Sequence, residues 1–239
     1  MRVITIGISG PSCSGKTTIT RILQQLVKKT IVIYQDDFFK PDTDIPVDPE
    51  TQLSNWDCPE ALDFERLIQT IQYVQQHHVL PTDYHSNEVN NTHDGSDLVT
   101  PQQISEWKKK IHQNNNAGNV DDDTLWLIVD GFMLISDPQL YGLFDYRVFV
   151  TASYTTLKKR REDRQGYHTL EGYWVDPPGY FDAIVWPEFL RAHQHVPGPH
   201  HQQQQEKQNL DDDHDVILID TDILSIPEAA ETVISALWS

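Results

Sequence analysis

The chain has 239 residues, and its 18 Lys and Arg against 36 Asp and Glu give a formal net charge of −18 at pH 7. This length favours one large α/β domain over residues 1–239, and so acidic a chain argues against a general nucleic-acid partner, which needs a basic footprint. Only Cys13 and Cys58 are present, and no stretch approaches the roughly 18 apolar residues of a membrane span. We therefore expect a cytoplasmic, reduced protein with no membrane partner, and a monomer.

The N-terminal segment joins an apolar run at 3–8 to a glycine-rich loop at 10–17. In a phosphate-binding loop, backbone N–H groups surround phosphate oxygens, a lysine reaches the β and γ phosphates, and a hydroxyl binds Mg²⁺. Lys16 and Thr17 hold those two positions here. The loop residues expected at a nucleoside triphosphate are Gly10, Ser12, Ser14, Gly15, Lys16, Thr17 and Thr18.

Apolar patterns further along the chain predict the elements of a sheet covered by helices. Helical spacing spans 17–29, a second helix is predicted to begin after Asp57, and a third covers 227–238. Buried strands are predicted at 3–8, 31–34, 125–130, 146–150 and 216–220. Because strands alternate with helices, we expect an α/β fold with a doubly wound parallel sheet.

Three segments stand outside this pattern. Residues 77–123 are poor in apolar side chains and predict a polar surface insertion, interrupted by a capped helical piece at 100–111. Residues 160–182 combine glycines, prolines and aromatics, which is typical of a lid. Residues 196–215 contain a histidine and glutamine tract followed by aspartates, which predicts a disordered loop, with a histidine metal site as the alternative.

Carboxylates follow two of the predicted strands. Asp36 and Asp37 come after the strand at 31–34, and Asp130 closes the strand at 125–130. In a doubly wound sheet these strand ends meet the crevice of the phosphate loop, so we expect Asp36 to act as base for an acceptor hydroxyl. The alternatives are turn or cap residues for the pair and a simple strand-end acceptor for Asp130.

A basic cluster at 158–164 holds five Lys and Arg in seven residues. If this segment is helical, Arg160 and Arg164 share one face and Arg161 is rotated by about 100°. We expect the first two to bind triphosphate and the third to reach the acceptor. A solvated helix face paired with its own acidic residues is the alternative.

Several motifs are narrower than the phosphate loop. They read QDDFFKP at 35–41, WDCPEAL at 56–62, DGF at 130–132, PGYFD at 178–182 and VWP at 185–187. Over most of the chain these motifs resemble the nicotinamide riboside kinases, and the long polar insertion resembles the fungal branch. The resemblance implies a fold similar to nucleoside monophosphate kinases. It also implies transfer of the γ phosphate of ATP to the 5′-hydroxyl of nicotinamide riboside, giving nicotinamide mononucleotide for NAD salvage.

The resemblance also implies roles for single residues. Asp36, Lys16 and Arg160 would be catalytic, Arg160 and Arg164 would contact ATP, and Mg²⁺ would meet Thr17, Asp36 and Asp130. Asp130 stands where the family carries a glutamate. The residues implied at the riboside are Asp36, Asp37, Phe39, Trp56, Asp57, Arg161, Tyr167 and Asp176. Trp56 would lie beside the nicotinamide ring, Asp57 would hold the ribose hydroxyls, and Tyr167 is spaced one residue further along than in the family.

Two other functions stay open on the sequence. A uridine or cytidine kinase would share the phosphate loop, the base and the lid, and would differ in how the nucleobase is held. A nucleotide-binding regulator that has lost catalysis would not need Lys16, Thr17 and Asp36 intact. The aromatic and acidic residues expected at the riboside favour a cationic pyridinium ring over a neutral base.

Overall fold

The computed structural model describes residues 1–90, 98–115, 123–164, 166–168, 172–194 and 216–238. Its main sheet has five parallel strands in the order β2-β3-β1-β4-β7. The strands are β1 (Arg2–Ser9), β2 (Thr30–Tyr34), β3 (Thr124–Gly131), β4 (Tyr146–Thr151) and β7 (Val216–Asp220). Strand β1 lies at the centre, with Ile6 opposite Ile128 of β3 on one side and Tyr146 of β4 on the other. The predicted α/β fold with a parallel sheet is confirmed.

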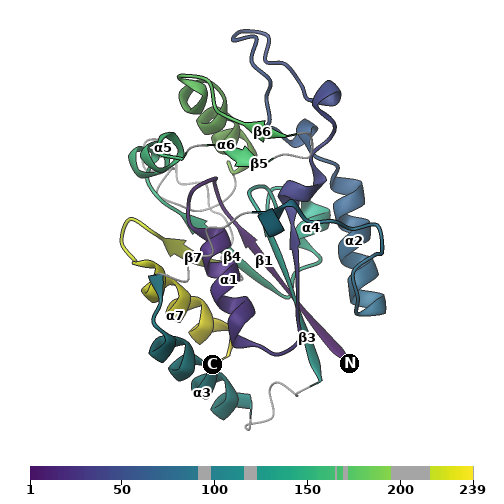
Figure 1. Cartoon of the computed structure of the whole chain (residues 1–239), viewed down its shortest axis with the longest axis vertical. Coiled ribbons are helices and arrows are strands. Elements are labelled where there is room, and N and C mark those ends of the chain that lie inside the picture. Colours follow the sequence, from purple (N-terminus) through teal and green to yellow (C-terminus); the bar gives the residue numbers. More distant parts are fainter. Residues whose placement is uncertain (91–97, 116–122, 165, 169–171, 195–215, 239) are drawn as a thin grey trace.

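Helices cover both faces of this sheet because its strands are apolar on both sides. The helices are α1 (Lys16–Leu26), α2 (Phe64–His77), α3 (Pro101–Asn115), α4 (Pro138–Tyr141), α5 (Tyr154–Glu162), α6 (Trp186–Ala192) and α7 (Ile226–Leu237). Ile6 and Ile128 are buried in one cluster with residues of α1, α3 and α7, whereas Leu127 and Val129 pack with residues of α2 and α4. Figure 1 shows these two groups of helices on opposite sides of the sheet.

Helix α3 belongs to the polar insertion expected at 77–123, yet it packs on the domain. Trp107 and Ile111 are 5% and 4% exposed and join the core cluster that includes α1 and α7. The Trp107 indole and the Lys110 ammonium both bind Glu231 of α7. The insertion therefore contributes an amphipathic helix to the core. Its residues 91–97 and 116–122 lie outside the part of the chain that the structure describes.

The lid expected at 160–182 contains a short antiparallel hairpin, β5 (Tyr167–His168) and β6 (Tyr173–Trp174). Figure 1 shows the hairpin and α5 together, beyond the carboxyl ends of the parallel strands. A π-helical turn, Phe181–Val185, connects the lid to α6, and Tyr180 just before it is 1% exposed. The end of the lid is thus packed into the domain. Residues 195–215, which include the predicted low-complexity loop, fall outside the described residues.

Among the predicted helix limits that differ from the structure, two are near the site and are wrong. The second helix begins at Phe64, because the Asp63 side chain caps it by accepting from the Arg66 N–H, and Pro59–Ala61 forms only a short 3₁₀ turn. Helix α5 ends at Glu162, so Arg164 does not continue the helical face that carries Arg160. Within the described ranges, no helix is both long and apolar enough to cross a bilayer.

Candidate active site

The loop between β1 and α1 has a backbone that requires glycine. Gly10 has φ 144°, and a Cβ atom there would lie 1.9 Å from the Val150 carbonyl oxygen. Gly15, at φ 100°, is the N-cap of α1, and no side chain of the described residues caps that end. The N–H groups of the first helical turn and the positive end of the helix dipole therefore face outward, as an anion-binding loop requires.

The polar side chains of this loop fit a bound triphosphate. Ser14 is fully buried, and its hydroxyl has no hydrogen-bond partner among the described residues. Lys16, in the first turn of α1, is only 9% exposed. Among the described residues, the Ser14 hydroxyl and the N–H groups of the uncapped helix start have no side-chain acceptor beside the largely buried Lys16, and phosphate oxygens supply acceptors.

Carboxylates meet this loop from the ends of β2 and β3. Asp130 is 4% exposed and accepts a hydrogen bond from the Thr20 hydroxyl at 2.9 Å. Burial, together with the charge of Asp36, raises the pKa of Asp130 to about 6, although Lys16 and the Thr20 and Thr17 hydroxyls act against the rise. The predicted metal residues Thr17, Asp36 and Asp130 therefore lie close enough to influence one another. Carboxylate and hydroxyl oxygens are the ligands that Mg²⁺ prefers.

The raised pKa of Asp130 predicts a specific pH dependence of stability. Between about pH 4 and pH 6, the carboxyl group of Asp130 is deprotonated in the unfolded chain but still protonated in the folded protein. The free energy of unfolding therefore falls as pH rises through this range and levels off above about pH 6. Two pKa units correspond to about 3 kcal/mol. Asp130→Asn should remove this decrease, so that the variant gains stability relative to wild type as pH rises. Urea unfolding of both proteins in a metal chelator measures the difference, and a pH-independent difference would contradict the assignment.

Asp36 and Asp37 are neighbours with opposite environments in the 3₁₀ turn Gln35–Phe38. Asp36 is exposed, whereas Asp37 is 2% exposed. The Asp37 carboxylate accepts from the Tyr84 hydroxyl at 2.6 Å and from the Asn87 N–H at 2.8 Å. Although the sequence led us to expect Asp37 at the riboside, its oxygens are occupied by segments of the protein. It supports the turn that presents Asp36.

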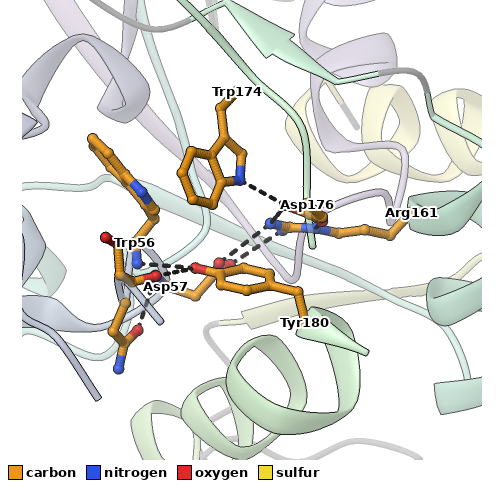
Figure 2. A network of polar contacts seen from close by, with 8 residues as sticks. Trp56, Asp57, Arg161, Trp174, Asp176 and Tyr180 are labelled. Atoms are coloured by element: carbon orange, nitrogen blue, oxygen red, sulfur yellow. Dashed lines mark hydrogen bonds and ion pairs between the residues drawn. The ribbon is translucent and has the colours of Figure 1, made fainter. Parts of the chain in front are cut away.

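Arg161 joins two carboxylates in the interior (Figure 2). Its side chain is 6% exposed and binds Asp57 through both Nη atoms, at 3.2 and 3.3 Å. Its Nε atom donates to Asp176 at 2.6 Å. Burial raises the pKa of Asp57, and the guanidinium acts against the rise. One cation thus faces two carboxylates, one before the turn that leads to α2 and the other in the lid.

Aromatic rings line the same region. Trp56 lies next to Phe39 and Trp174, with ring centroids 5.5 and 5.8 Å apart. The Trp174 indole donates to Asp176 at 2.9 Å, and the Tyr180 hydroxyl accepts from the backbone N–H of Trp56 at 3.1 Å (Figure 2). Lid residues therefore close directly against the residues expected at the riboside.

The remaining predicted residues are distributed around this centre. Arg160 donates to the Cys13 carbonyl oxygen of the phosphate loop at 3.3 Å and to the Thr221 hydroxyl at 2.9 Å. Arg164 follows α5 and is exposed. Tyr167 pairs through its backbone with Trp174, and its side chain lies outside the described part of the structure.

Three contributors to the site were not predicted from the sequence: Trp174, Tyr180 and Tyr84. Trp174 and Tyr180 lie in the aromatic-rich lid segment, and Tyr180 also lies in the PGYFD motif, but neither signal assigned these two side chains to the site. Tyr84 lies in the polar insertion, 47 residues from its partner Asp37. Contacts over such distances along the chain have no periodic signature.

The fold and the site together define a P-loop kinase. A central parallel strand enters a phosphate loop, carboxylates lie at neighbouring strand ends, and a basic helix lies at the lid.

A family model described as "AAA domain" matches residues 6–171. The chain is 35% identical over 195 residues to nicotinamide riboside kinase of Schizosaccharomyces pombe, covering 82% of this chain and 81% of that protein. It is 38% identical over 193 residues to the protein of that name from Saccharomyces cerevisiae, covering 80% and 78%, and 31% identical over 199 residues to human nicotinamide riboside kinase 1, covering 82% and 79%. The chain belongs to the nicotinamide riboside kinase family.

Proposed function

We propose that this chain transfers the γ phosphate of ATP to the 5′-hydroxyl of nicotinamide riboside, giving nicotinamide mononucleotide and ADP. The observation that carries the proposal is the combination of a phosphate loop with a riboside site rich in aromatic rings and carboxylates. Arg161 offsets only one of the two carboxylates that it binds, and Trp56 and Trp174 lie beside them. Such a site suits a ring that carries a positive charge, since a cation against an aromatic face contributes roughly 0.5 to 2 kcal/mol.

In this reaction the protein orients the acceptor and neutralises phosphate charge. Asp36 takes the proton of the 5′-hydroxyl as the oxygen bonds to the γ phosphorus, and the β–γ bridging oxygen leaves with ADP. Lys16 and Arg160 stabilise the negative charge on the transferred group. Bound Mg²⁺, held by Thr17, Asp36 and Asp130, would add further charge neutralisation. Asp57 holds the ribose hydroxyls.

The competing function is phosphorylation of uridine or cytidine. A neutral pyrimidine is recognised by hydrogen bonds to its edge, whereas a pyridinium ring offers only its carboxamide for such bonds. Nicotinamide riboside recognition must therefore depend on stacking and charge. We propose that the whole chain acts in this way as a single, monomeric kinase domain in the cytoplasm.

Direct competition between substrates tests the proposal. With Mg²⁺ and ATP present, nicotinamide riboside should be phosphorylated with a much higher kcat/KM than uridine or cytidine, because aromatic rings and carboxylates favour a cationic ring over a neutral pyrimidine. Trp56→Ala should raise KM for nicotinamide riboside more than it lowers kcat, and Trp56→Phe, which keeps a ring, should restore much of the loss. Preferential phosphorylation of uridine in the mixture would overturn the proposed substrate.

A further inference from the structure

Residues 84–88 of the polar insertion, here named the brace, cross the turn that carries Asp36. Tyr84 donates to one Asp37 oxygen at 2.6 Å, and the Asn87 N–H donates to the other at 2.8 Å. Both Asp37 oxygens are thereby bound by the same short segment. Because Asp37 adjoins Asp36 and is buried, its attachment restricts the backbone from which Asp36 projects.

Tyr84 is fixed from several directions. Its ring stacks on Phe38 with centroids 6.0 Å apart, and its hydroxyl accepts from the Tyr34 N–H at 3.3 Å while donating to Asp37. Burial and the neighbouring Asp37 raise the pKa of Tyr84, so the hydroxyl keeps its proton and remains a donor. Tyr84 thus connects the end of β2 to the turn that follows it.

The other end of the brace reaches α1. Glu88 forms an ion pair with Arg21 at 2.7 Å, and both side chains are largely buried, at 18% and 11% exposed. Arg21 also hydrogen-bonds the Tyr34 side chain, and Tyr34 lies opposite Asp130 in the sheet. The brace therefore contacts α1, which follows the phosphate loop, and the end of β2, which lies beside Asp36 and Asp130.

We propose that the brace fixes the position of Asp36 and that Tyr84 is a positioning residue for phosphoryl transfer. This rests on the proposed function, in which Asp36 takes the proton of the acceptor. Proton transfer requires the base within hydrogen-bond reach of the hydroxyl, so a small displacement of the turn is costly. In this role Tyr84 acts through Asp37, to which its hydroxyl is bound, rather than on a substrate directly.

The test is Tyr84→Phe, which removes one oxygen and keeps the ring on Phe38. We expect kcat to fall about tenfold, within the range that small misplacements cost, with KM for riboside and for ATP close to wild type. Thr70→Val is the matched control, because it removes a buried hydroxyl whose acceptor, within the part of the chain that the structure describes, is the Arg66 carbonyl of α2 at 2.8 Å. The control should lower the unfolding midpoint without changing kcat.

A double-mutant cycle with Asp37→Ala, which removes both acceptor oxygens, identifies the route of the effect. In the Asp37→Ala background, Tyr84→Phe should lower kcat little further, whereas independent effects would multiply. Unchanged kcat in Tyr84→Phe, an equal loss in Thr70→Val, or multiplying effects would each overturn the positioning role.

Hydrogen exchange gives a readout that does not require turnover. The backbone amides of residues 35–39 should exchange faster in Tyr84→Phe than in wild type and be unchanged in Thr70→Val. Unchanged exchange in Tyr84→Phe would overturn the proposal whatever nucleoside is the substrate. Preference for uridine, by contrast, would overturn the proposed function while leaving the exchange result intact.

Discussion

Asp36→Asn is expected to lower kcat by about 100-fold or more while leaving ATP affinity close to wild type. The variant keeps the size of the side chain and removes the proton acceptor, and general-base catalysis typically contributes that much. The phosphate loop, on a different segment, stays intact, so nucleotide binding measured by calorimetry without Mg²⁺ should persist.

Asp42→Asn is the matched control for Asp36→Asn. Asp42 is an exposed carboxylate in the next short turn, Asp42–Asp44, so it makes the same change in net charge away from the proposed base. It should leave kcat near the wild-type value. If Asp36→Asn retained more than about a tenth of wild-type turnover, another group would have to take the proton.

Arg161→Ala should raise the riboside KM strongly and also destabilise the protein. The substitution leaves Asp57 and Asp176 near each other without their shared cation, and breaking a buried ion pair by removing one partner costs about 3–5 kcal/mol. Without the guanidinium, Asp176 of the lid is no longer linked to Asp57, the residue expected at the ribose hydroxyls. Initial-rate kinetics and denaturant unfolding measure the two effects separately.

Two neighbours in α5 serve as comparisons for Arg161→Ala. Arg160 contacts the phosphate loop, so Arg160→Ala should chiefly lower kcat. Lys159 is an exposed cation of the same helix, so Lys159→Ala should change neither kcat nor the riboside KM. Equal and small effects of Arg160→Ala and Arg161→Ala would mean that the helix presents only a solvated basic face.

The sheet was predictable because each of its buried strands is a continuous apolar run, and the phosphate loop has a fixed spacing of glycines and lysine. The start of α2 was not, because Asp57 and Asp63 both precede segments that could begin a helix. In the fold, a β-bridge joins Phe39 and Leu62, so Pro59–Ala61, between Asp57 and Asp63, forms a separate 3₁₀ turn and α2 begins after Asp63. Cap chemistry alone does not distinguish two nearby candidates.

The candidate site divides in the same way. Local spacing on one helix predicts that Arg160 and Arg161 point in different directions, but it does not predict that Asp57 and Asp176 bind Arg161. Nor does local spacing predict the inward direction of Asp37, because it depends on Tyr84 and Asn87 from a segment whose composition predicts only a polar insertion. The sequence identifies residues that carry charge, and the fold decides which of those charges it uses for its own support.

Because the start of α1 has no side-chain cap, a bound nucleotide should raise the free energy of unfolding of this protein. Most helices complete their first turn with a serine, threonine or aspartate side chain, but this one begins at Gly15 and leaves its N–H groups for a ligand. A triphosphate bound there takes the place of the missing cap, and any ligand that binds only the folded state raises the free energy of unfolding as its concentration rises above Kd. The thermal midpoint of this enzyme should therefore follow the adenylate supply, so that an enzyme starved of ATP is also an enzyme closer to unfolding.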